Sequence, residues 1–113
     1  MDLAPLEHLN GLTFLDIADN QVADLTPLAG LNLTDLLCRN NEVRDVAALA
    51  GQTRLFTLDL SSNQISDLTP LAGLTALQWL SLEGNQIADL SPLAGLAALQ
   101  TLFLGGNQIA DLS

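Results

Sequence analysis

Apolar residues follow two periods along this chain, one of 2 residues and one of about 22. Residues 73–94 read GLTALQWLSLEGNQIADLSPLA, the 22 residues before them read GQTRLFTLDLSSNQISDLTPLA, and the stretch after them reads GLAALQTLFLGGNQIADLS. The L-x-L core of each unit alternates apolar and polar positions, which predicts a short strand with one buried face. Repetition at a fixed period predicts that these strands stack side by side in a solenoid.

The repeats account for the whole chain. Residues 2–8 (DLAPLEH) match residues 89–95 (DLSPLAG), so the sequence opens within a repeat, and residues 30–50 are the most irregular unit because one position is missing. We predict a single domain over residues 1–113 with no recognisable caps. Its units are a half repeat at 2–8 and repeats at 9–29, 30–50, 51–72, 73–94 and 95–113.

Leu77, Leu80, Leu82, Asn85 and Ile87 fit the pattern L-x-x-L-x-L-x-x-N-x-I, and with this pattern the chain resembles the leucine-rich repeat proteins. The continuation NQI-x-DL-[ST]-PLAGL is similar to the bacterial, internalin-like branch with repeats of 22 residues. The resemblance implies an α/β fold, a right-handed solenoid with five short parallel strands on the concave face and short, 3₁₀-like helical turns on the convex face. It also implies a protein partner, because members of the family mostly bind proteins.

One asparagine follows each predicted strand, where the backbone turns inside the stack. Its amide both donates and accepts, so it can satisfy backbone groups that an apolar side chain would leave unpaired. We predict a structural ladder formed by Asn20, Asn41, Asn63, Asn85 and Asn107.

The return path of most repeats carries Thr-Pro or Ser-Pro. Thr26, Thr69 and Ser91 are predicted to be N-caps, each followed by Pro at the first helical position. Residues 47 and 48 are both Ala, so we predict that the turn of this repeat lacks the cap and is the loosest.

A second polar column lies four residues after each asparagine. Stacked carboxylates could share Ca²⁺, but calcium sites need several oxygen ligands, and repeats that bind calcium usually have Gly-rich loops, which are absent here. The favoured interpretation is that each carboxylate accepts N–H groups of its own turn. The column comprises Asp24, Asp45, Asp67, Asp89 and Asp111.

Residues between the framework leucines point to the concave face. The only Trp of the chain, Trp79, is expected to face solvent beside Leu37 and Phe103, as an interface anchor does. The alternative is that the aromatic side chains pack on each other and shield the sheet. The predicted protein-binding residues are Phe14, Asp16, Asp35, Leu37, Arg39, Asp59, Trp79, Ser81, Glu83 and Phe103.

The formal charge is −10, with no Lys and only three arginines, Arg39, Arg44 and Arg54. Nucleic acid and anionic membranes need clustered cations, so neither is an expected partner. Arg39 is expected to pair with Asp16 or Asp59. No apolar run approaches the roughly 20 residues of a membrane helix. The N-terminus carries no signal peptide, which predicts a cytoplasmic protein if that end is native and a secreted or surface protein if a leader has been lost.

Asp16 and Asp59 share a column two strands apart, at about 9–10 Å, close to the separation in an inverting glycosidase. An open, acidic face gives no enclosure that would raise one pKa, so we predict no enzyme. His8 has no nucleophile or metal-ligand pattern around it and is expected to be solvated. Cys38 occupies a framework position and is expected to be a buried hydrophobe. No metal and no cofactor are expected.

A cut solenoid exposes its apolar core and an unpaired strand edge. Glu7 and His8 partly shield the N-terminal end, where later repeats have Ala and Gly. The strand at residues 101–104 is predicted to be an open C-terminal edge, flanked by Leu99 and Ile109. We therefore predict self-association through the C-terminal end.

Two geometries are available for this association. Two copies can meet at their C-terminal ends as a two-fold homodimer, which is the favoured arrangement. In the other, Asp111 to Ser113 of one copy meet Asp2 to Leu6 of the next in a head-to-tail stack. The favoured function is a non-catalytic protein-binding scaffold that uses the concave face. The alternative is a structural or self-assembling repeat unit, an uncapped fragment or an engineered excision, that associates through its exposed ends.

Overall fold

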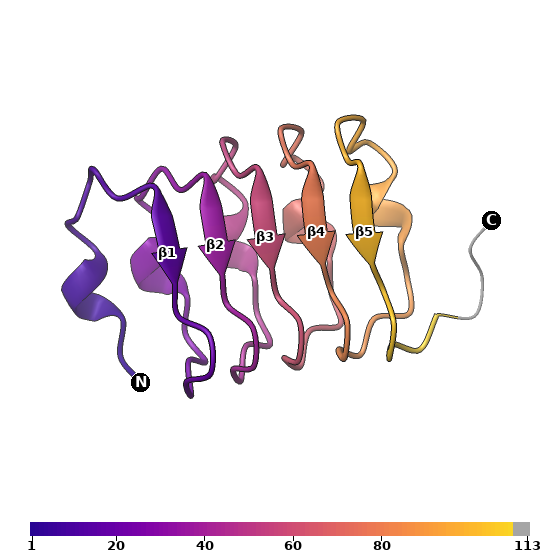
Figure 1. The fold of residues 1–113 in the computed structure, drawn as a ribbon, viewed down its shortest axis with the longest axis horizontal. Helices are drawn as coiled ribbons and strands as arrows, with labels where there is room; N and C mark the ends of the chain where they lie inside the picture. The colour runs from indigo at the N-terminus through magenta and orange to yellow at the C-terminus, as the bar shows by residue number, and fades with distance from the viewer. Residues whose placement is uncertain (110–113) are drawn as a thin grey trace.

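The computed structural model describes residues 1–109 and has the predicted leucine-rich repeat architecture (Figure 1). Five strands of three residues form one sheet in chain order, and every neighbouring pair is parallel. The short helical turns lie behind the sheet in Figure 1. The strands are β1 (Phe14–Asp16), β2 (Asp35–Leu37), β3 (Thr57–Asp59), β4 (Trp79–Ser81) and β5 (Thr101–Phe103).

Each strand is preceded along the chain by one 3₁₀ turn, so one coil of the solenoid contains one of each. The predicted α/β leucine-rich repeat solenoid is therefore confirmed, with 3₁₀ turns as the helical element. The turns are η1 (Ala4–Leu6), η2 (Thr26–Leu28), η3 (Ala47–Leu49), η4 (Thr69–Leu71) and η5 (Ser91–Leu93).

The framework residues form the core between the sheet and the turns. Leu36, Leu58 and Leu80 lie at the centres of the three inner strands in register, and all are fully buried. Burying one such side chain contributes about 1.5–3 kcal/mol. Cys38 is also fully buried, as predicted, and burial raises the pKa of its thiol to about 12.

The N-cap residues of the outer turns have no capping side chain, and an Asp just before each N-cap accepts the N–H of the first turn residue instead. Thr26 is the first residue of η2 and Leu25 is its N-cap, so the predicted cap position was wrong by one residue. The carboxylate of Asp24 accepts the N–H of Thr26 at 2.9 Å. Asp45 accepts the N–H of Ala47 in the same way at 2.8 Å. The turn of the second repeat has no Thr-Pro, as predicted, and it keeps the Asp hydrogen bond of the other turns.

A left-handed residue precedes each ladder asparagine. Gly84 and Gly106 have φ of 67° and 71°, and non-glycine residues hold the same position in the first three repeats, with φ of 61° at Asp19, 58° at Asn40 and 56° at Ser62. Glycine adopts this conformation without steric cost, whereas an L side chain is strained in it. The corner of the coil therefore demands positive φ whatever residue occupies it.

The missing residue of the second repeat lies between Leu31 and Leu33. Elsewhere the equivalent leucine donates its N–H to a carbonyl three residues earlier, as Leu77 donates to Leu74 at 3.1 Å. In the shortened repeat, Leu33 donates instead to the side-chain oxygen of Gln52 at 3.1 Å. Gln52 replaces a framework leucine and is 2% exposed. This glutamine thus repairs the backbone at the deletion.

No helix within residues 1–109 is long and apolar enough to cross a membrane.

Candidate functional site

Alternation along the strands places the predicted binding residues on one face, opposite the 3₁₀ turns, which we call the concave face. The parallel register aligns Asp16 with Leu37, then Asp59, Ser81 and Phe103 in a central column. Burial along this face is uneven. Phe14, Asp16, Arg39 and Phe103 are exposed, Asp35, Leu37, Trp79 and Glu83 are partly buried, and Asp59 and Ser81 are buried.

The centre of the concave face is a buried polar network. Asp59 Oδ1 accepts hydrogen bonds from the Ser61 N–H at 3.0 Å and from the Ser61 hydroxyl at 2.6 Å. The Ser61 and Ser81 hydroxyl oxygens are 2.6 Å apart. Exposure is only 8% for Asp59, 2% for Ser61 and 4% for Ser81. A carboxylate and two hydroxyls are therefore fixed side by side across β3 and β4.

Beside this network, the Trp79 and Phe103 rings lie 5.6 Å apart at an angle of 58°. This tilted arrangement is a favourable aromatic geometry. Trp79 is therefore not free-standing, since it packs on its neighbour and keeps part of its surface exposed. Mutual aromatic packing, one of the two interpretations from the sequence, is thus observed, and the role of Trp79 as an interface anchor stays a prediction.

Negative charge dominates the concave face. Asp35 is held by the Thr34 hydroxyl at 2.9 Å, and Asp16 accepts the N–H of Ala18 at 3.0 Å. Within residues 1–109 the only ion pair joins His8 Nε2 to Glu7 Oε1 at 3.4 Å. The predicted pairing of Arg39 with Asp16 or Asp59 is therefore wrong, because the exposed guanidinium lies more than 4 Å from either carboxylate.

The side-chain amides of the inner asparagines bond backbone groups of their own repeat and of the repeat before it. Asn63 Oδ1 accepts the N–H of Val43 one repeat earlier at 3.0 Å, and its Nδ2 donates to the carbonyls of Cys38, Leu60 and Ser61 at 3.0–3.1 Å. Asn41 and Asn85 repeat this pattern and are also buried. Asn20 and Asn107, in the first and last repeats, are more exposed.

The second polar column serves the turns. Asp24, Asp45, Asp67 and Asp89 each accept the N–H of the residue two positions ahead, at 2.8–2.9 Å. These bonds confirm the interpretation of the carboxylates as turn acceptors. Asp111 lies outside the described residues. Within residues 1–109, no three Asp, Glu, His or Cys side chains gather in a position to hold a metal ion.

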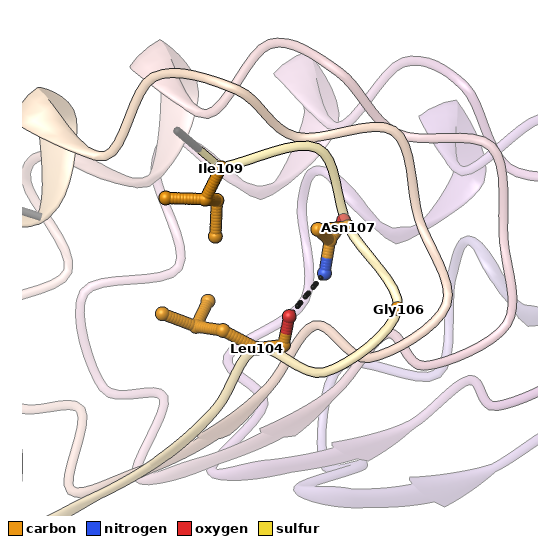
Figure 2. A pocket seen from close by; sticks show the side chains of 4 residues that line it. All are labelled: Leu104, Gly106, Asn107 and Ile109. Carbon is orange, nitrogen blue, oxygen red and sulfur yellow. Dashed lines mark hydrogen bonds between the residues drawn. The ribbon is translucent and has the colours of Figure 1, made fainter. Parts of the chain in front are cut away.

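The end of the solenoid beyond β5 is open in the described part of the chain. Leu102 is 38% exposed, whereas its counterparts in the inner strands are fully buried. A hollow of about 250 Å³ lies just after β5 in the chain, and Figure 2 shows the Asn107 amide directed at the Leu104 carbonyl there, a bond of 2.9 Å. The hollow is lined by Leu104, Gly106, Asn107 and Ile109.

Three residues with notable environments were not among the predicted binding residues. Ser61 links Asp59 to Ser81, and the signal for it was a polar residue in the column two positions after theirs. Phe56 is exposed just before β3, at a position that is Thr or Gln in every other repeat. Gln52 is the one polar residue in a leucine column.

Comparison with known proteins agrees with this geometry. A leucine rich repeat model matches residues 31–87, and a model of two leucine rich repeats matches residues 75–113. No curated protein matches the sequence.

The solved structures that resemble the chain are themselves leucine-rich repeat solenoids. Internalin C2 from Listeria monocytogenes is 51% identical with a TM-score of 0.92, over 95% of this chain and 48% of that one. Internalin F from the same organism is 35% identical with a TM-score of 0.73, over 98% of this chain and 40% of that one. A leucine-rich repeat protein from Leptospira interrogans is 28% identical with a TM-score of 0.82, over 96% of this chain and 29% of that one.

The chain thus spans about half the length of the internalin C2 structure and less of the others. Proteins with this fold are typically non-enzymatic scaffolds for protein interaction. By family model, sequence identity and fold, the chain belongs to the leucine-rich repeat family and is of the internalin-like type.

Proposed function

We propose that this chain is a non-catalytic scaffold that binds a partner protein on its concave face. The observation that carries the proposal is the half-exposed pair of Trp79 and Phe103 beside the buried network of Asp59, Ser61 and Ser81. Interface anchors are typically aromatic side chains that border fixed polar groups. The convex turns, in contrast, present short Asp side chains that accept hydrogen bonds from the backbone of their own turn.

The pair of Asp16 and Asp59 does not support catalysis. The carboxylates belong to β1 and β3 with Leu37 between them in the register. The hollow at Leu104 and Ile109 lies beyond β5, at the far end of the sheet. A general acid and base would need a water-excluding enclosure around both carboxylates.

The experiment is a selection of randomised peptides displayed on phage against the wild-type chain, followed by calorimetric titration of a selected peptide. We expect Trp79→Ala to weaken the binding free energy of the peptide by about 2 kcal/mol or more. Ala72→Arg, a matched change at an exposed position on the convex side, should leave the affinity unchanged. Affinity lost in Ala72→Arg and kept in Trp79→Ala would place the site on the wrong face.

Self-association is a second candidate function, favoured by the open end beyond β5. In the fourth repeat, Leu82 and Gly84 donate their N–H groups to the Phe103 and Gly105 carbonyls. The equivalent N–H groups of Leu104 and Gly106 have no acceptor within residues 1–109. A second copy that meets this end about a two-fold axis would cover Leu102 and close at a dimer. Residues 111–113, which the head-to-tail alternative invokes, lie outside the described part.

Sedimentation equilibrium of the 113-residue chain tests this second candidate. We expect a concentration-dependent dimer that Leu102→Glu dissociates, since the substitution places a charge on the apolar end. Leu6→Glu, at the N-terminal end, is the matched control and should leave the dimer intact. A monomer at every concentration, or dissociation by Leu6→Glu alone, would contradict association through the C-terminal end.

A further inference from the structure

Asp59 is a nearly buried carboxylate without a counter-ion. It lies on β3, the middle strand of the sheet, and is 8% exposed. Oδ1 is occupied by the two bonds from Ser61, whereas Oδ2 accepts no hydrogen bond from any residue in 1–109. Every fully buried polar side-chain atom in that range has a partner, so Oδ2 reaches the surface of the concave face. One oxygen of a largely desolvated carboxylate is thus presented outward.

The hydroxyls next to Asp59 can offer only acceptors to a ligand. Ser61 donates its single hydroxyl proton to Asp59 at 2.6 Å. The contact of 2.6 Å between the Ser61 and Ser81 oxygens therefore has Ser81 as its donor. Because both hydroxyl protons are already used in these hydrogen bonds, Oδ2 of Asp59 and the lone pairs of Ser81 are the groups left for a ligand. These groups accept hydrogen bonds and donate none, so they favour a ligand that donates.

Two further carboxylates near Asp59 favour a cationic ligand. Asp35 in the second repeat and Glu83 in the fourth lie in the columns on either side of the central one. A carboxylate that has lost most of its water is stabilised strongly by a hydrogen-bonded positive group. Trp79 is diagonal to Asp59 across β3 and β4, which places the Cα atoms of the two residues about 8 Å apart by strand geometry. A planar cation at Asp59 therefore has an aromatic side chain on the neighbouring strand.

We propose that Asp59 is the anchor point for an arginine of the partner protein, whose guanidinium donates to Asp59 Oδ2 and Ser81 Oγ and stacks on Trp79. A guanidinium carries several N–H donors in one plane and stacks on aromatic rings, whereas an ammonium is a compact point charge. Two separate acceptors beside a ring suit the planar group. This assignment rests on the proposed function of the concave face and names the chemistry of its partner.

The test is a titration of the ¹⁵N-labelled chain with N-acetylarginine methylamide, followed by ¹H–¹⁵N spectra. We expect saturable shifts at the Ser61 amide and the Trp79 indole. Asp59→Asn keeps the oxygen that accepts from Ser61 and removes the charge, so the fold should persist. The affinity for the arginine probe should fall about ten-fold or more. Glu42→Gln, which removes an exposed carboxylate away from this face, should leave the affinity unchanged.

N-acetylcitrulline methylamide, the neutral counterpart, should bind about ten-fold or more weakly than the arginine probe. Equal binding of the two probes, equal binding to Asp59→Asn, or the absence of saturable shifts would overturn the assignment of arginine. The peptides selected from the library separate this failure from that of the proposed function. If they need Trp79 but neither arginine nor Asp59, the concave face binds a partner and only the anchor assignment fails.

Discussion

The side-chain oxygen of Gln52 accepts the backbone N–H of Leu33 at 3.1 Å, across the gap left by one missing residue. The amide nitrogen of Gln52 donates to the carbonyls of Leu28 and Ala29 at 3.0 and 3.1 Å. A single side chain thus ties the third repeat to the turn of the first repeat and to the strand entry of the second. The deletion and the glutamine are two halves of one structural adjustment.

Gln52→Leu restores the residue found in the other repeats, yet we expect it to destabilise the chain. It leaves the Leu33 N–H buried without an acceptor, at a cost of about 1–3 kcal/mol in unfolding free energy. Urea unfolding measures the loss. Gln86→Leu, at an exposed glutamine, is the matched control and should change stability by less than about 0.5 kcal/mol.

Insertion of one Ala between Asn32 and Leu33 provides the second arm of that experiment. With the repeat restored to full length, the N–H of Leu33 regains a local carbonyl, and Gln52→Leu should become neutral or stabilising. An equal penalty in both backgrounds would show that Gln52 does not compensate for the deletion.

Asn63→Ala should cost about 1–3 kcal/mol, because the Val43 N–H is left unpaired inside the stack and three carbonyls each lose one of their two donors. Asn107→Ala should cost less, since Asn107 is only partly buried and one of the three bonds that its amide nitrogen donates is long at 3.4 Å. Denaturant titration compares the two variants. Equal losses would contradict a ladder whose strength depends on coverage by neighbouring repeats.

Ser62→Gly should stabilise the chain by about 0.5–1 kcal/mol, because relief of left-handed strain exceeds the added entropy of the unfolded chain. Gly84→Ala should cost about 1 kcal/mol or more, because alanine is strained at this positive φ. A steric clash does not add to the cost, since the new Cβ would lie at an ordinary 3.4 Å from Ser62. Gly73→Ala is the control, with open space and no left-handed φ. Thermal unfolding that ranks Gly84→Ala with Gly73→Ala would contradict this account of the corner.

The turn carboxylates should make stability depend on acid pH. Hydrogen bonds from the turn residues Thr26, Thr69 and Ser91 lower the pKa values of Asp24, Asp67 and Asp89 below their ordinary 3.8. The unfolded chain then takes up protons first, so this stabilisation is complete above pH 3.8 and is lost as the pH falls through the lower folded values.

Replacing all three by Asn keeps the acceptor oxygen and removes the titration. Urea unfolding between about pH 5 and pH 2 should give a shallower loss of stability for this variant than for the wild type. Glu42→Gln serves as a control, since its carboxylate accepts no hydrogen bond from the described residues. Identical slopes in the triple variant and the wild type would mean that other groups carry the acid sensitivity.

The repeat pattern predicts most of the architecture because one framework recurs five times. Leu36, Leu58 and Leu80 follow directly from period-2 alternation within a 22-residue repeat. The cap was placed one residue late because Thr favours the N-cap position, whereas in the structure Leu25 occupies it and Asp24 supplies the side-chain oxygen. The pairing of Arg39 with Asp16 or Asp59 is absent in the described part of the chain, as the small contribution of exposed ion pairs allows.

The contacts that distinguish this chain from its own consensus were harder to infer. The role of Gln52 depends on where the chain shortens, and a side chain that acts across a gap leaves no periodic signal. The hydrogen bonds between Asp59, Ser61 and Ser81 join positions whose residues differ from repeat to repeat. They could therefore be identified only from the three-dimensional structure.

The most direct test of the concave face as the binding site is a ¹H–¹⁵N map of the chain with a library-selected peptide bound. We expect the largest shift changes along the central strands, at Thr57, Asp59, the Trp79 indole and Ser81, with the amides of η2 to η5 nearly unchanged. Changes concentrated on the 3₁₀ turns, or at Leu104 and Ile109 beyond β5, would contradict the proposed function.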